Sequence, residues 1–179
     1  MNKTIELLYE EHANIINAID IVKQLKPLIS QNTERYEELC HELLDYFRDY
    51  ADRYHHHKEE LILFPLMSKK NELLGEGVVA EMFSQHTEFR EMTSNIRVAL
   101  SEKQYTSAQK QLEEYTEALL DHIAVENDEL FVIAESLFSE DELDKMYFGF
   151  RDVDAQIGAD AKQKLEGWAT SIRSSLLMA

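Results

Sequence analysis

Histidines and glutamates interrupt the apolar pattern of this chain at regular intervals. His55 and His122 are each followed, four residues later, by a glutamate, Glu59 and Glu126. Residues four apart lie one turn apart on the same face of a helix, so each pair can converge on one site. Imidazole nitrogens and carboxylate oxygens are ligands for transition metals. The chemistry that this spacing predicts is therefore metal binding.

Two further histidines, His12 and His86, occupy similar positions in other parts of the chain. All six residues fall where the spacing of the surrounding apolar residues predicts a buried side chain. A buried carboxylate without a partner is severely unfavourable, and buried imidazoles need their ring nitrogens satisfied. A metal would supply the compensating positive charge, because no lysine or arginine is expected on these buried faces. The predicted metal ligands are His12, His55, Glu59, His86, His122 and Glu126.

Four imidazoles and two carboxylates suffice for two metal ions. Each ion would take two histidines, and both glutamates would bridge the ions. This arrangement leaves each ion short of six ligands, with room for a bridging oxo or hydroxo group and for a small exogenous ligand. Ligand type alone does not select the metal, because imidazole with carboxylate suits iron, manganese and zinc, and inherent affinity favours zinc over ferrous iron.

The polar residues next to the first His-x-x-x-Glu pair are interpreted differently. We expect His57, Lys58 and Glu60 on a solvated helix face. His56 has two interpretations. Since Glu60 follows it by four residues, His56 can be an extra ligand or a supporting group. The equivalent position in the second pair is Ile123, however, so the internal repeat favours leaving His56 out of the ligand set.

The elements that must position these residues are helices. Apolar residues recur at spacings of three and four over long stretches, and five glycines and two prolines are few for 179 residues. Four helical segments are predicted, separated by Pro27, by the Gly-Glu-Gly sequence at 75–77 and by a polar connection at 101–104. The predicted fold is all-α, an antiparallel up-down-up-down four-helix bundle with extra C-terminal helices.

The chain beyond the fourth segment is predicted to be a helical extension. Residues 1–138 would form the metal-binding bundle, and residues 139–179 would pack on the bundle or on a dimer partner. Ser139, with Glu142 three residues on, is typical of a capping box that begins a helix. A further helix is expected from about Asp154 to Ala179.

Charge and cysteine content exclude several classes of partner. A formal charge of −17 repels nucleic acid and anionic membranes, so neither is expected to bind. Cys40 is the only cysteine, which excludes an intrachain disulfide and a thiolate cluster and fits a reducing compartment. Neither a signal peptide nor an apolar stretch of membrane-spanning length is recognisable. We therefore expect a cytoplasmic protein, and a homodimer is left open.

The order and spacing of these residues resemble the hemerythrin-like family, the bacterial HHE cation-binding domains. The resemblance covers roughly residues 5–135 and includes Leu-Phe-Pro at 63–65 after the first His-x-x-x-Glu. It implies an antiparallel four-helix bundle with a non-haem di-iron centre, and it is this resemblance that favours iron. Invertebrate oxygen carriers of the family have His-x-x-x-His in the third helix, whereas Arg90 follows His86 here. A fifth histidine ligand is therefore not expected, and stable reversible O2 carriage is not implied.

The resemblance implies a protein that binds or senses O2 or NO, or that reports iron or redox state. The alternative is a di-iron redox enzyme that handles peroxide or NO, or that repairs iron–sulfur clusters. Some relatives that act in repair carry a cysteine-bearing N-terminal region, and here no cysteine precedes His12. A metal that only stabilises the bundle is the third interpretation, and whether the protein is an enzyme is left open.

Overall fold

Every regular element of the described chain is helical. The computed structural model describes residues 2–177, and among them there is no strand, so the all-α prediction is confirmed. The elements are α1 (Lys3–Ile19), α2 (Val22–Leu25), α3 (Leu28–Gln31), α4 (Thr33–Tyr46), η1 (Phe47–His56), η2 (Glu59–Leu63), α5 (Phe64–Lys70), α6 (Glu72–Leu74), η3 (Gly75–Val79), α7 (Ala80–Ser101), α8 (Tyr105–Val125), η4 (Glu126–Leu130), α9 (Phe131–Leu137), α10 (Glu140–Ile157) and α11 (Ala159–Leu177).

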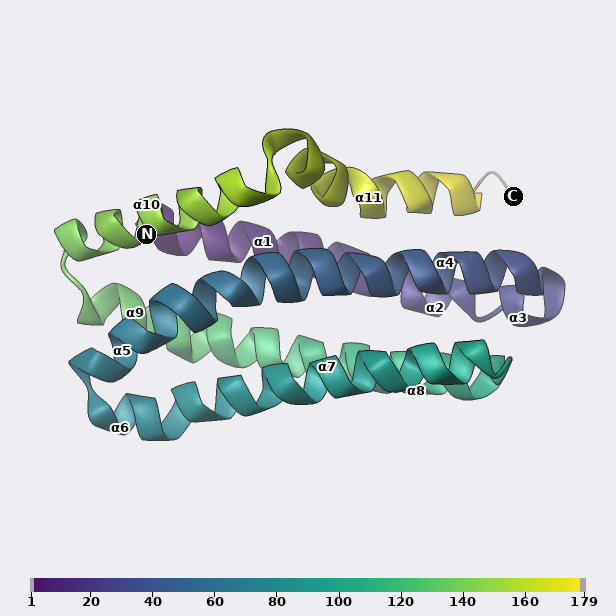
Figure 1. Ribbon diagram of the computed structural model, residues 1–179, viewed down its shortest axis with the longest axis horizontal. Coiled ribbons are helices and arrows are strands. Elements are labelled where there is room, and N and C mark those ends of the chain that lie inside the picture. The colour runs from purple at the N-terminus through teal and green to yellow at the C-terminus, as the bar shows by residue number, and fades with distance from the viewer. Residues whose placement is uncertain (1, 178–179) are drawn as a thin grey trace.

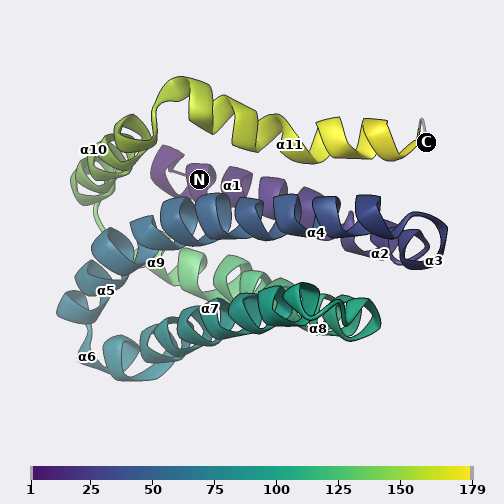
Figure 2. The same cartoon turned by 45° about the vertical axis from the view of Figure 1, so that its right-hand side comes forward.

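These helices form four long stretches that lie side by side (Figure 1). The first stretch is α1–α3, the second runs from α4 through η1 and η2 to α5, the third is η3 with α7, and the fourth runs from α8 through η4 to α9. α7 packs along α8, and α1 contacts both η1 and α8. Figure 2 shows α10 and α11 lying over the first and second stretches, and α1 is in contact with both of them.

The second and fourth stretches leave α-helical geometry at the predicted ligands. The π-helical segment η1 covers Phe47–His56, and the π-helical segments η2 and η4 begin at Glu59 and Glu126. A π turn holds more residues than an α turn and is frequent at functional sites. Each glutamate of the two His-x-x-x-Glu pairs thus opens a π turn, so the internal repeat of the sequence recurs in the backbone.

Apolar side chains fill the interior on both sides of the predicted ligands. One buried cluster draws on all four stretches and on both C-terminal helices, and it includes Ile15, Phe47 and Leu119. The other includes Leu8, Phe64 and Phe131. The predicted ligands lie between the two clusters along each helix, so the apolar packing keeps bulk water away from them.

The helix ends in the first half of the chain follow the sequence signals only in part. Asn32 caps α4, because its side chain accepts a hydrogen bond from the backbone of Arg35. α1, however, ends at Ile19 rather than at Pro27, and the short helices α2 and α3 complete the connection. Within residues 2–177, none of the helices combines the length and the apolarity needed to cross a bilayer.

The C-terminal extension consists of α10 and α11. The predicted capping box at the start of α10 is confirmed by hydrogen bonds in both directions between Ser139 and Glu142. The break between the helices lies at Gly158 rather than near Asp154, because Gly158 has a φ of 86°, a conformation that glycine adopts without steric cost. α11 is described to Leu177, and the last two residues of the predicted helix lie outside the described residues.

Two glycines of the extension should respond to alanine in opposite directions. Gly158→Ala should lower the free energy of unfolding by about 1–3 kcal/mol, because its φ of 86° is essentially confined to glycine. Gly167→Ala should raise it by about 0.5–1 kcal/mol, because Gly167 lies inside α11 and an added Cβ would meet no neighbour. Chemical denaturation measures both changes, and two changes of the same sign would contradict the assigned backbone.

Candidate metal centre

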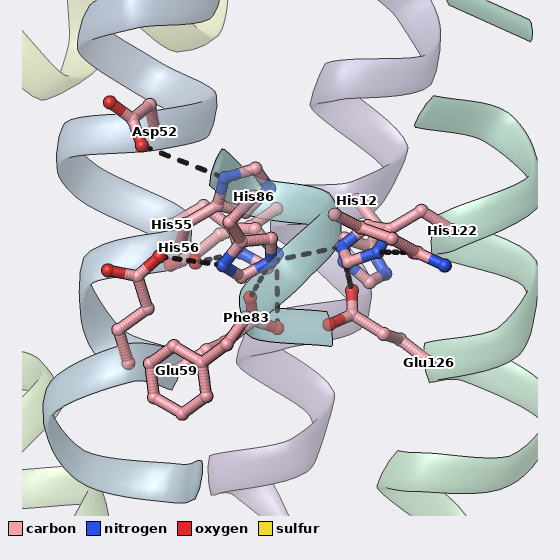
Figure 3. A network of polar contacts seen from close by, with 12 residues as sticks. His12, Asp52, His55, His56, Glu59, Phe83, His86, His122 and Glu126 are labelled. Carbon is pink, nitrogen blue, oxygen red and sulfur yellow. Dashed lines mark hydrogen bonds and ion pairs between the residues drawn. The ribbon is translucent and has the colours of Figure 1, made fainter. Parts of the chain in front are cut away.

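The six predicted ligands are buried and gather between the four stretches (Figure 3). None is more than 2% exposed. They are His12 of α1, His55 of η1, Glu59 of η2, His86 of α7, His122 of α8 and Glu126 of η4. Each stretch thus contributes one predicted histidine, and the second and fourth stretches add the glutamates.

The candidate ligand atoms fall into two groups, and within each group they lie within 4.8 Å of one another. The first group is formed by His12, His55, Glu59 and Glu126. The second group is formed by His56, His86 and His122. Imidazole and carboxylate groups bind transition metals, so both groups offer candidate ligands.

Each of the two glutamates connects a histidine of the first group with a histidine of the second. The contacts are Glu126 Oε2 to Nε2 of His12 and of His122 at 3.2 Å each, Glu59 Oε1 to Nε2 of His55 at 3.4 Å, and Glu59 Oε2 to Nε2 of His86 at 3.7 Å. The carboxylates therefore lie between the groups, in the position of bridging ligands.

Each of the four predicted histidines is held by its outer ring nitrogen. Nδ1 donates to an oxygen in every case: His12 to Asn127 at 2.8 Å, His55 to Glu11 at 2.9 Å, His86 to Glu60 at 2.8 Å and His122 to Gln85 at 2.7 Å. A neutral imidazole that donates from Nδ1 has an unprotonated Nε2, so four lone pairs face the interior. Metal-ligating histidines are held in the same way, by a hydrogen bond from the other ring nitrogen.

The donor atoms fit a metal cluster. Nε2 of His86 lies 3.1 Å from Nε2 of His122, so in the neutral rings two lone pairs face each other. Buried atoms without a hydrogen-bond partner in the described chain include both oxygens of Glu59 and Glu126 and Nε2 of His12 and His55. Lone pairs and carboxylates crowded together in a dry interior repel one another, whereas a shared cation attracts them all.

The electrostatics of the centre also call for positive charge. Burial lowers the pKa of His55, but Glu59 and a second carboxylate raise it by more, to about 10. Burial raises the pKa of Glu126, but His122 and His12 outweigh burial and hold that pKa well below its ordinary range. Two buried carboxylates thus draw positive charge onto the imidazoles, and a metal ion can supply that charge in exchange for protons.

His56 is a fifth histidine at the centre, which the sequence repeat did not predict. It is 2% exposed, and its ring lies flat on His86, with ring centroids 3.7 Å apart and planes inclined by 10°. Two rings stacked in this way cannot both aim an in-plane lone pair at one ion about 2.1 Å away. Nδ1 of His56 has no hydrogen-bond partner in the described chain. His56 thus belongs to the second group but, unlike the other four histidines, is not held by a hydrogen bond from Nδ1.

The expectation of a solvated face after His55 is wrong for Lys58. Lys58 is fully buried and pairs with Glu11 and Asp154. Glu60 also points towards the centre, because its carboxylate accepts a hydrogen bond from the ring of His86. The reason is the π-helical geometry of this stretch, because residues after a π turn face directions that the α-helical period does not predict.

A cavity of about 230 Å³ borders the second group. His56 lines it, and its apolar walls come from Phe47, Ala51, Phe89 and Tyr115. At its edge, Arg90 pairs with Asp52 and with Glu60. The cavity is large enough for a small molecule to approach the second group.

Comparison with known proteins agrees with the geometry. The family model described as the hemerythrin HHE cation-binding domain matches residues 3–134, so the resemblance inferred from the motifs is confirmed. The searches of curated proteins and of solved structures gave no significant match.

Removal of either connecting carboxylate should abolish metal loading. Glu59→Ala or Glu126→Ala should lose bound metal and the stability that metal confers, because each carboxylate contacts both groups. Metal analysis after anaerobic purification and thermal unfolding measure the two effects. Glu129→Ala, exposed in the same π turn as Glu126, is the matched control. Full metal content and an unchanged Tm in either variant would contradict the bridging positions.

Proposed function

The chain belongs to the hemerythrin HHE cation-binding family, and from that premise we propose that it binds two iron ions and uses them to bind or sense O2 or NO. The observation that carries the proposal is the pair of carboxylates that contact both histidine groups. A single ion would need only one group, whereas two groups joined by two carboxylates suit a dinuclear centre. Because imidazole and carboxylate also bind zinc and manganese, the choice of iron rests on the family.

We further propose that residues 1–138 form an antiparallel four-helix bundle around this centre. The arrangement in Figure 1 supports this, because the connections through α3, through α6 and between α7 and α8 lie at alternate ends of the long helices. In such a bundle every helix presents one face to the middle, and side chains from facing helices build the ligand set.

In this proposal the protein divides the histidines between the two ions. His12 and His55 would hold one ion and His86 and His122 the other, and each of the two glutamates contacts one histidine of both pairs. Iron bound there supplies the one-electron chemistry with which O2, NO or peroxide react. The protein fixes the imidazoles through Nδ1 and keeps bulk water from the carboxylates.

The cavity beside His56 supports a small uncharged ligand. Its apolar walls come from Phe47, Ala51, Phe89 and Tyr115. Each of the three arginines in its lining pairs with a carboxylate, Arg90 with Asp52 and both Arg48 and Arg97 with Asp45, so the charge at its edge is balanced. A diatomic molecule needs no charged partner to enter such a cavity. His56 is the member of the second group that lines the cavity, so a turn of its ring would change access to His86 and His122.

The cysteine chemistry of a repair function has less support. Cys40 is fully buried in the apolar cluster around Phe47, and burial, with a smaller effect of Glu37, raises the pKa of its thiol to about 12. The thiolate is the reactive form of cysteine, so this thiol is inert at neutral pH.

Anaerobic metal analysis followed by exposure to air tests the proposed function. Protein purified without O2 should contain about two irons per chain, as the ligand count implies. Its visible spectrum should change on exposure to air or NO. A change that reverses under vacuum supports reversible binding, whereas irreversible oxidation with consumption of peroxide supports the enzyme. A chain that takes up only one ion, or that stays spectroscopically silent towards O2 and NO, would overturn the proposal.

Narrowing the cavity should slow ligand binding without loss of metal. Thr93 lines the cavity on α7, so Thr93→Phe should reduce the association rate of NO by about one order of magnitude, within the range that association rates of related complexes span. Stopped-flow absorbance measures this rate. Thr87→Phe, exposed on α7 outside the cavity lining, should bind NO as the unmodified protein does. Equal rates in all three proteins would show that the ligand enters elsewhere.

A further inference from the structure

A buried chain of charges joins the C-terminal helices to the candidate metal centre. Asp154 of α10 is 7% exposed, and its Oδ1 lies 2.8 Å from Nζ of Lys58. Lys58 also contacts Glu11, which accepts the 2.9 Å hydrogen bond from Nδ1 of His55. The path from α10 to a predicted ligand therefore consists of three consecutive contacts between buried polar side chains.

Lys58 is held tightly in this path. A buried ammonium group is costly unless it is paired on several sides. Here it has a carboxylate on two sides and lies 3.7 Å from the centre of the Tyr54 ring. The Tyr54 hydroxyl in turn donates to Oδ1 of Asp154 at 2.7 Å. The ammonium group of Lys58 is thus fixed between Glu11 and Asp154. A stronger contact of Lys58 with one carboxylate weakens its contact with the other carboxylate.

A similar path on the opposite side of the centre is open to solvent. Glu60 accepts from Nδ1 of His86 and pairs with Arg90, which also pairs with Asp52. The side chain of Arg90 is 41% exposed, whereas that of Lys58 is fully buried. Water screens charges far more strongly than a protein interior does, so a change of charge should be transmitted better along the buried path.

We propose that Asp154 is a positioning residue of the metal centre, which acts through Lys58 and Glu11 on His55. This inference rests on the proposed metal-binding function. By sharing the lysine charge, Asp154 leaves Glu11 more negative, which strengthens the hydrogen bond from His55 and makes its Nε2 a better electron donor. α10 and α11 lie outside residues 3–134, so the extension adjusts a centre whose ligands all lie within the family match.

Two substitutions should shift the midpoint potential of the iron-loaded centre in opposite directions. In Asp154→Asn the lysine charge falls entirely to Glu11, so the midpoint potential of the iron-loaded centre should rise. Metal affinity should fall, towards the lower end of the roughly 10- to 100-fold range for changes beside metal-ligating histidines. In Lys58→Met, Glu11 is left un-neutralised, so the potential should fall. The double variant should resemble Lys58→Met, because the link to Asp154 is already cut.

Two control variants on α10 separate this effect from loss of packing. Asp152→Asn removes an exposed carboxylate two residues away, and Val153→Ala removes buried packing without a change of charge. Val153→Ala should lower Tm without moving the midpoint potential, and Asp152→Asn should change neither. Asparagine retains an oxygen that accepts from the Tyr54 hydroxyl but loses the ion pairs of Asp154 with Lys58, Arg151 and Lys162, so Asp154→Asn should also lower Tm. Comparison with Val153→Ala separates that loss of stability from the shift in potential.

The Nδ1 proton of His55 gives a readout that does not depend on iron. In the NMR spectrum of zinc-loaded protein its resonance should move upfield in Asp154→Asn and downfield in Lys58→Met, because the hydrogen bond to Glu11 weakens or strengthens. The same proton can be followed without metal, so the link is tested even if loading fails. A wild-type chain that binds no metal would overturn the proposed function. A normally loaded Asp154→Asn whose proton resonance and potential equal those of Asp152→Asn would overturn the role of Asp154.

Discussion

The structure depends on one electrostatic constraint: two carboxylates and four imidazole lone pairs share an apolar interior. Such a set of acceptors is stable only if positive charge lies among them, as protons or as metal. The raised pKa of His55 and the lowered pKa of Glu126 are two expressions of that demand. The apolar clusters on both sides increase it, because they remove the water that would otherwise solvate the carboxylates. A tightly bound cation is therefore what such a fold favours.

The hydrogen bonds that hold the histidines follow the two-fold repeat of the chain. In the first and third stretches, the residue just before the histidine, Glu11 or Gln85, accepts from a histidine of the next stretch. In the second and fourth stretches, the residue just after the glutamate, Glu60 or Asn127, accepts from the remaining two histidines. Every stretch thus supplies both a candidate ligand and the group that orients a ligand of another stretch. Packing of the four stretches against one another therefore also brings the candidate ligands and their hydrogen-bond partners together.

The sequence predicted the helical fold and the placement of the six residues because α-helical periodicity reports burial directly. It failed at Lys58, where π turns break that periodicity and no local residue pattern announces the change. The residues that accept hydrogen bonds from the histidines had a recognisable signal in the sequence, since Glu11 and Gln85 each come just before a histidine of the repeat. No sequence signal identified Asp154, because its contact with Lys58 joins α10 to the second stretch and depends on how the extension packs.

The two halves of the centre, one with His12 and His55 and the other with His86 and His122, resemble each other in ligands but differ in surroundings. Each has one histidine backed by a carboxylate and one backed by an amide. The carboxylate of the second half, Glu60, pairs with the half-exposed Arg90 beside a cavity, and the ring of His56 lines that cavity. The carboxylate of the first half, Glu11, pairs with fully buried Lys58 under the C-terminal helices. A small molecule that entered the cavity would therefore meet the second half first, while the charged side chains under the extension contact the first half. Because each of the two glutamates contacts a histidine of both halves, they are the groups through which a change of charge at one half would reach the other.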